Sequence, residues 1–191
     1  MITYSFGDNL YINLTNRCTN HCAFCDKGHL QKVVNADLKL KYEPTAAEII
    51  SEVKKKEGYK ELVFCGVGEP TLKLDVILEV LRAFPKKDTR LNTCGHAYCI
   101  YPDRMVAKEL KSAGLKKINI SLNATSKEEY DKTCKPAFPD AYEKMLRFAK
   151  DCADEGIITY GSFVSGFANE GKAKALTEKL GVILKIRKDL N

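Results

Sequence analysis

The sequence predicts an α/β fold, a partial (βα)6 TIM-like barrel with parallel strands. Strand-like apolar runs alternate with amphipathic helical segments along the chain, a pattern typical of parallel strands joined by right-handed crossovers. The predicted strands number six, whereas a closed barrel of this kind has eight. No linker, repeat or low-complexity segment interrupts the alternation, so residues 1–191 are expected to form a single domain.

The helices and strands follow from local signals taken in chain order. Thr45 and Glu48 form a capping box that begins the first helix, and Ser126 with Glu129 repeats this pattern later. Glycines such as Gly114 end the helices. The predicted strands are residues 10–15, 61–66, 89–94, 117–124, 157–164 and 182–187. The main predicted helices are residues 45–57, 72–83, 103–113, 140–155 and 170–180.

Polar and apolar residues alternate along several strands, which indicates a polar concave face. In residues 117–124, Asn119, Ser121 and Asn123 alternate with isoleucine and leucine. Lys185 and Arg187 on the last strand are expected to point inward, where they can meet a carboxylate or phosphate. Edge-strand charges that discourage strand pairing explain this pair equally well. An open doubly wound sheet with a solvated polar row is the alternative fold.

The composition is that of a soluble globular protein, with 45% hydrophobic and 29% charged residues. Neither a signal peptide nor an 18-residue apolar segment is apparent, so we expect a cytoplasmic protein without a membrane partner. In a reducing compartment, clustered thiols among the eight cysteines favour metal binding or catalysis. The net charge of +6 raises nucleic acid as a partner. However, lysines such as Lys116 and Lys117 precede strands and are expected on the rim opposite the chemistry.

Three cysteines lie in one loop after the first predicted strand: Cys18, Cys22 and Cys25. Thiolates are soft ligands that suit iron–sulfur clusters and zinc. Three ligands on a four-iron cluster leave one iron open, and an open site is typical of a reactive metal centre. A structural zinc site completed by His21 or His29 is one alternative. A redox pair formed by Cys22 and Cys25 is another.

A glycine-rich turn follows the second predicted strand, with the sequence "GVGEPTL" over residues 66–72. Glycines let the backbone approach a ligand closely, because they lack the Cβ atom. Carbonyl groups and Glu69 at the end of this strand can accept hydrogen bonds from a cationic amine. The turn can also be read as an ordinary entry loop to a helix. Its place beside the cysteine loop at the mouth of a barrel favours a ligand site.

These motifs together resemble the radical S-adenosylmethionine (SAM) superfamily. The matching features are the Cys18-x-x-x-Cys22-x-x-Cys25 loop, the Gly-Glu-Pro turn at 68–70 and the segment "SLNA" at 121–124. The resemblance covers nearly the whole chain and implies the radical SAM core type of partial barrel. It also implies a [4Fe–4S] cluster bound by the three cysteines, with SAM completing the fourth iron. One electron from the cluster would cleave SAM, and the resulting 5′-deoxyadenosyl radical would abstract hydrogen from an unknown substrate.

The resemblance also assigns roles to individual positions. Phe24 would lie near the adenine, and the turn with Gly68, Glu69 and Pro70 would bind the methionine end of SAM. Contacts with the ribose or carboxylate are implied for Ser121, Asn123 and Thr93. The usual turn in the family is Gly-Gly-Glu-Pro, and Val67 replaces its first glycine here.

Within the superfamily, the segments "NLYINLTNRCTNHCAFC", "FCGVGEPTL", "LNTCGHA" and "CKPAF" resemble the TatD-associated radical SAM proteins. The implied partners are SAM, an electron donor such as flavodoxin or ferredoxin, and a substrate that covers an open barrel mouth, with macromolecules among the candidates. Roles near the radical are open for Cys94, Cys99, Cys134 and His96, although packing or surface exposure explains each of them. A zinc-binding structural protein and a nucleic-acid-interacting protein are the rival functions.

Overall fold

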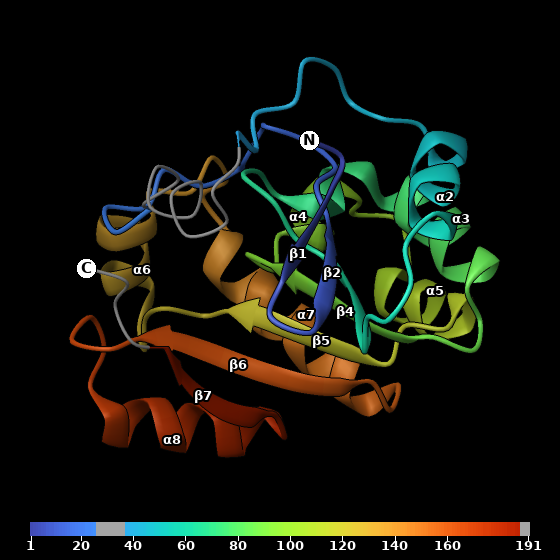
Figure 1. Cartoon of the computed structure of the whole chain (residues 1–191). Coiled ribbons are helices and arrows are strands. Elements are labelled where there is room, and N and C mark those ends of the chain that lie inside the picture. The colour runs from blue at the N-terminus through green and yellow to red at the C-terminus, as the bar shows by residue number, and fades with distance from the viewer. Residues whose placement is uncertain (26–36, 188–191) are drawn as a thin grey trace.

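The computed structural model describes residues 1–25 and 37–187, and it contains a seven-stranded sheet (Figure 1). The strand order follows the chain order from β1 to β7. The six strands from β2 onward are parallel, as predicted, and β1 pairs antiparallel with β2. The strands are β1 (Thr3–Phe6), β2 (Asn9–Ile12), β3 (Glu61–Phe64), β4 (Asp88–Thr93), β5 (Lys117–Ser121), β6 (Ile158–Val164) and β7 (Ile183–Arg187).

This strand order distinguishes a partial barrel from a doubly wound sheet. In a doubly wound sheet the order reverses at a switch point, which places helices on both faces. Here each parallel strand lies beside its neighbour in sequence, and right-handed crossovers then place the helices on one face. Figure 1 shows them around the outside of the sheet. The strands β1 and β7 form the two edges, so the barrel is open as expected.

The predicted helices are formed, although the one expected at 45–57 spans Ala46–Lys54 and the one expected at 103–113 spans Val106–Ala113. The capping box of Thr45 and Glu48 is formed in full, and Gly114 ends a helix with a φ of 104°. Ser126 caps its helix through Glu129 N–H, but the Glu129 carboxylate accepts from Thr125 instead. The helices are α2 (Ala46–Lys54), η1 (Pro70–Lys73), α3 (Leu74–Ala83), α4 (Ala97–Ile100), α5 (Val106–Ala113), α6 (Lys127–Cys134), α7 (Ala141–Asp154) and α8 (Glu170–Leu180).

Two elements differ from the prediction. The strand β1 was not expected, and it forms a hairpin with β2 through a two-residue turn at Gly7 and Asp8. Gly7 has a φ of 56°, which a glycine adopts at little cost. The short helix α4 was also not expected, because four residues are too few to show a helical period.

The two faces of the sheet differ as the alternation predicts. On β5, Ile118 and Ile120 are fully buried in the core beneath the helices. Asn119 lies between them on the concave face, and it is 5% exposed. The concave face is therefore polar and yet largely shielded, which suits a site for a polar ligand. In the described part of the chain, no helix is both long and apolar enough to cross a membrane.

Candidate functional site

The cysteine loop follows β2 at the carboxyl end of the sheet, where the active sites of such barrels lie. Backbone hydrogen bonds fix this loop against residues 133–137, which run from the end of α6 into the loop after it. His21 N–H donates to the Cys134 carbonyl and Ala23 N–H to the Thr133 carbonyl, both at 2.9 Å. Ala137 N–H donates to the Thr19 carbonyl at 2.9 Å. The loop is therefore held like an added strand.

Two loop cysteines each have a cysteine from elsewhere in the chain as a neighbour. A hydrogen bond from Cys134 lowers the pKa of Cys22. Burial raises the pKa of Cys94, and a hydrogen bond with Cys18 raises it further. Cys22 also senses the charge of Cys18, so these two loop thiols lie near each other. The structure thus places Cys94 and Cys134 beside the cysteine loop.

The three cysteine thiols of the loop suit an iron–sulfur cluster, although the structure does not hold all three gathered around one point. Cys18 and Cys22 are half-buried and Cys25 is exposed. Within residues 1–25 and 37–187, no three His, Cys, Asp or Glu side chains are already gathered in a metal-binding arrangement. Three thiols on one loop, two of them close enough to sense each other's charge, are a chemically fitting ligand set for iron. His29, a predicted alternative ligand, lies outside the described residues.

The glycine-rich turn after β3 packs directly on the start of the cysteine loop. Glu69 N–H donates to the Arg17 carbonyl at 2.7 Å. A Cβ atom on Gly68 would lie 2.2 Å from the Arg17 oxygen and 2.4 Å from the Thr15 oxygen. Both atoms belong to the backbone, so only glycine allows this approach. The two motifs that the sequence singled out form one unit.

The Glu69 carboxylate holds this turn to the end of β4. Its Oε1 accepts from Thr71 N–H at 2.9 Å and from the hydroxyls of Thr71 and Thr93, both at 2.6 Å. Its Oε2 accepts from Cys94 N–H at 2.7 Å. Glu69 is 2% exposed. The carboxylate is therefore occupied by the chain itself, and Thr93 serves this network.

Replacing Glu69 with glutamine should destabilise the site. The new amide can keep the three donors on its oxygen, but its NH2 group then faces the Cys94 N–H and leaves two donors opposed. We expect the free energy of unfolding to fall by about 1–3 kcal/mol, the cost of an unsatisfied buried group. Urea unfolding measures this change, and Glu57→Gln at an exposed position is the matched control. Equal stability of Glu69→Gln and wild type would contradict the role of this network.

A buried histidine connects the cysteine loop to β4 and α6. His96 is fully buried, with Nδ1 2.8 Å from the Thr19 hydroxyl and Nε2 2.8 Å from the Tyr130 hydroxyl. Asn20 Nδ2 donates to Tyr130 at 3.0 Å, so the Tyr130 proton is available to His96. Nδ1–H then donates to Thr19. Burial lowers the pKa of His96 to about 4, and the ring is neutral at pH 7.

This histidine should make stability depend on pH. Above about pH 6.5 the side chain is neutral in both the folded and the unfolded chain. Below this pH only the unfolded chain takes up a proton, until the folded pKa of about 4 is reached. We expect His96 to reduce the free energy of unfolding by up to about 3 kcal/mol across this window.

The measurement is urea unfolding as a function of pH for wild type and His96→Gln. The variant should be less stable at pH 7 but show a flatter dependence between pH 6.5 and 4. His21→Gln, at an exposed histidine of the cysteine loop, is the control, measured over the same pH range. Parallel curves for His96→Gln and wild type would refute the assignment.

The remaining predicted residues lie at the same end of the sheet. The Phe24 ring packs edge to face with Phe167, with centroids 5.0 Å apart. Asn123 is 2% exposed and has a φ of 58°, a strained value of the kind that clusters at functional sites. Ser121 is half-buried beside Ser162 of β6, and Pro70 begins η1. The structure therefore brings the predicted SAM contacts to one rim.

Some residues of the site could not be found from sequence patterns. Glu43 accepts from the Thr15 hydroxyl at 2.6 Å and from Arg17 Nε at 2.8 Å. The ion pair with Arg17 is the main reason that the pKa of Glu43 falls to about 2. Thr19, Asn20 and Tyr130 complete the histidine network. A carboxylate or hydroxyl in a loop gives no periodic signal, so only the fold reveals these contacts.

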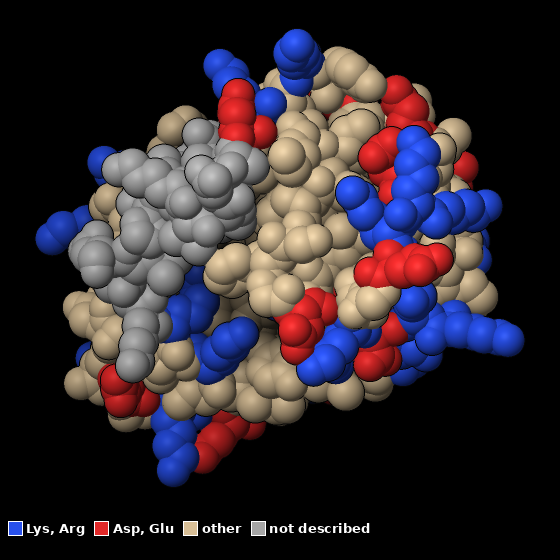
Figure 2. All heavy atoms as spheres, viewed as in Figure 1, with Lys and Arg blue, Asp and Glu red and all other residues tan. Residues whose placement is uncertain are grey.

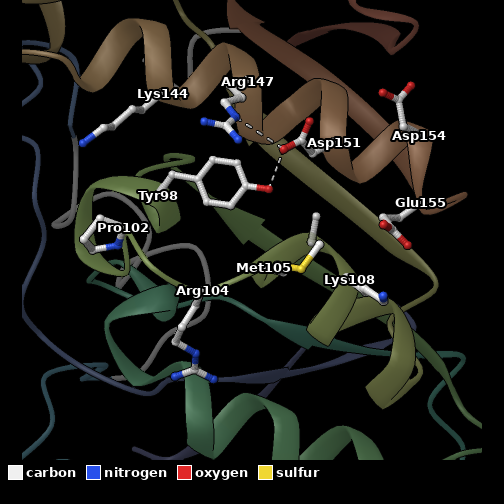
Figure 3. Close-up of a pocket in the computed structure, with 11 residues that line it drawn as sticks. Tyr98, Pro102, Arg104, Met105, Lys108, Lys144, Arg147, Asp151, Asp154 and Glu155 are labelled. Atoms are coloured by element: carbon white, nitrogen blue, oxygen red, sulfur yellow. Dashed lines mark hydrogen bonds and ion pairs between the residues drawn. The ribbon is translucent and has the colours of Figure 1, made fainter.

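The structure also has a pocket of about 350 Å³ on its outer helical layer, away from the predicted site residues. It lies between α4, α5 and α7, as Figure 3 shows. The Tyr98 hydroxyl donates to Asp151 at 2.7 Å there, and Arg147 lies 3.8 Å from the same carboxylate. None of the predicted cluster or SAM residues lines this pocket.

Comparisons with known proteins agree with this architecture. A family model described as the radical SAM superfamily matches residues 12–177. The chain is 29% identical over 182 residues to a probable GTP 3′,8-cyclase of Saccharolobus solfataricus, covering 92% of this chain and 54% of that protein. It is 32% identical over 161 residues to the GTP 3′,8-cyclase of Aliarcobacter butzleri, covering 82% and 47% respectively. The chain spans about half the length of these relatives.

Solved structures support the fold. Streptococcus suis SuiB bound to the precursor peptide SuiA matches with a TM-score of 0.72 at 13% identity, over 94% of this chain and 38% of that chain. A radical SAM methyltransferase from Sphaerobacter thermophilus matches with a TM-score of 0.66 at 16% identity, over 97% and 57%. The family match covers most of the sequence and includes the cysteine loop. The chain therefore belongs to the radical SAM superfamily, whose members use a [4Fe–4S] cluster and SAM.

Proposed function

We propose that Cys18, Cys22 and Cys25 bind the [4Fe–4S] cluster, and that the neighbouring glycine-rich turn binds SAM for reductive cleavage. The observation that carries this proposal is the packing of Gly68 and Glu69 against the backbone just before Cys18. When bound, the cluster would supply one electron that breaks the C5′–S bond of SAM, releasing methionine and providing a 5′-deoxyadenosyl radical for hydrogen abstraction from the substrate. Residues 1–191 would act as one catalytic core.

The chain's own groups would orient SAM around this unit. Because the Glu69 carboxylate already accepts four hydrogen bonds, we expect the carbonyls of the turn to bind the amino group instead. Phe24 and Phe167 would contact the adenine from the cysteine-loop side. Ser121 and Asn123 would donate to the ribose or the carboxylate. Thr93 would act indirectly, by fixing Glu69.

For the substrate and the electron donor we propose only the class of molecule. The relatives named GTP 3′,8-cyclases suggest a nucleotide-like substrate, but the match covers only about half of their length. The resemblance to the TatD-associated radical SAM proteins favours a separate group with its own substrate, and an open barrel mouth also admits a macromolecule. Flavodoxin or ferredoxin in the cytoplasm would supply the electron.

The test is reconstitution with iron and sulfide without oxygen, followed by dithionite and SAM. We expect a brown protein that binds SAM and forms 5′-deoxyadenosine. A loaded cluster that binds no SAM would overturn the proposal. Binding of SAM without cleavage would contradict the cleavage step alone. A colourless protein that holds only zinc would return the loop to a structural role.

A further inference from the structure

The concave face carries charged side chains that the proposed SAM site does not use. Glu61 of β3 accepts from Arg90 Nε of β4 at 2.8 Å and from Lys117 Nζ of β5 at 3.1 Å. Arg90 also donates to Asn92 Oδ1 at 3.0 Å. Lys117 is the first residue of β5 and so lies at the amino end of the sheet, on the rim where the sequence predicted it, but its ammonium pairs with the Glu61 carboxylate, whose side chain is 11% exposed. One carboxylate serves two cations here.

The strand β7 adds two cations to the same face. Lys185 and Arg187 stand opposite Ser162 and Val164 of β6, two residues apart, and so share one face. Within the described residues, neither cation forms an ion pair with a carboxylate. Burial lowers the pKa of Lys185, and repulsion from Arg90 and Arg187 lowers it further. The four cations of this face thus outnumber its carboxylate.

Two buried atoms on this face have no partner. Arg187 donates through Nη2 to Asn123 at 2.8 Å, but its Nε has no acceptor. Asn119 is 5% exposed and donates to the Ser162 hydroxyl at 3.2 Å, while its Oδ1 has no donor. Buried polar groups are nearly always hydrogen-bonded in folded proteins. An unused buried donor and an unused buried acceptor on the same face indicate room for polar groups of a ligand.

The charge distribution favours an anion. Like charges that converge in a partly shielded cleft repel one another, and an anionic ligand removes this cost. Figure 2 shows the molecule hollowed near the middle of this view, with Lys and Arg side chains and also an acidic side chain at the border of the hollow. The excess of cations over the paired Glu61 carboxylate is thus a feature of this face.

We propose that the concave face binds an anionic group of the substrate, a carboxylate or phosphate, between Arg90, Lys185 and Arg187. Asn119 Oδ1 accepts a hydrogen bond from a donor on the same substrate. This inference rests on the proposed function and names the chemical class of its substrate. Arg187 connects this site to Asn123 at the rim, so a substrate anchored here extends toward the cysteine loop, where hydrogen abstraction would occur.

The test is calorimetric titration of the reconstituted protein, saturated with SAM, at low ionic strength. The probes are inorganic tripolyphosphate and citrate, which distinguish phosphate from carboxylate recognition. We expect one of them to bind at a single site. Affinity should fall about tenfold in Arg187→Gln and about fivefold in Lys185→Ala, because each removes a charge-assisted contact. Lys179→Ala, at an exposed position on α8, is the charge-matched control that should bind as wild type does.

Three outcomes would overturn the inference. The first is SAM binding without binding of either probe, which leaves the proposed function intact. The second is unchanged affinity in Lys185→Ala and Arg187→Gln, which makes these cations edge-strand charges only. The third is competition between the probe and SAM, which assigns the cations to the SAM site. Failure to bind SAM in the same preparation would instead refute the proposed function, and this inference with it.

Discussion

Cys22→Ala should abolish both the iron–sulfur cluster and the formation of 5′-deoxyadenosine. Cys22 is the middle cysteine of the loop. Its thiol forms a hydrogen bond with Cys134 and lies near enough to Cys18 to sense its charge. Removing one of three ligands leaves two thiols, which cannot hold a four-iron cluster at three corners. Loss of a ligand should reduce activity by more than the roughly 10–100-fold effect of changing an outer-shell partner.

Iron and sulfide content, visible absorption and 5′-deoxyadenosine yield are the measurements. Cys152→Ala is the matched control, because Cys152 is a fully buried thiol on α7 that packs in the core. The control should lose some stability and keep its cluster. A Cys22→Ala protein with full iron content and wild-type product would contradict the assignment of the loop.

Gly68→Ala should impair SAM binding without removing any functional group. The added methyl group would lie 2.2 Å and 2.4 Å from two backbone oxygens of the cysteine loop, and neither atom can rotate away. The turn must therefore move away from the loop. Overpacking of this kind costs about 1–3 kcal/mol, and 1.4 kcal/mol corresponds to tenfold in affinity. We expect SAM affinity to fall by at least about tenfold.

The measurement is SAM titration of the reconstituted protein, together with its iron content. Gly171→Ala is the control, because the added methyl group there has only the Asn169 side chain nearby, at 3.3 Å. It should bind SAM as wild type does. If Gly68→Ala bound SAM normally, the close approach of turn and loop would have no part in forming the site.

Local signals predicted most of the fold, because each depends on a few adjacent residues. The Thr45 capping box and the Gly114 helix end are formed as expected. The hairpin at Gly7 and Asp8 was missed even though a two-residue glycine turn between apolar runs is a recognised signal. A short strand at the start of the chain simply gave too little alternation to stand out.

The sequence predicted the motifs of the candidate site and their position at the end of the sheet. It did not predict the side-chain contacts within the site. The cysteines and the turn could be found because both follow strands of a parallel sheet. The roles of His96 and Glu69 depend on partners that lie 24 to 77 residues away in sequence. Contacts between residues so far apart in sequence leave no periodic pattern in it. A buried histidine therefore cannot be told from a surface histidine by sequence alone. The ion pair of Lys117 with Glu61 was missed for the same reason, since the two residues are on different strands.

The strand-like pairing of the cysteine loop with residues 133–137 has a consequence for assembly of the holoprotein. Ordering a flexible segment around a metal costs conformational entropy for every residue that must be fixed. His21 and Ala23 are already fixed by hydrogen bonds, so the region of Cys18 and Cys22 is ordered during folding. If the loop binds the cluster as proposed, part of its backbone would already be ordered before iron arrives, and cluster assembly would cost less conformational entropy.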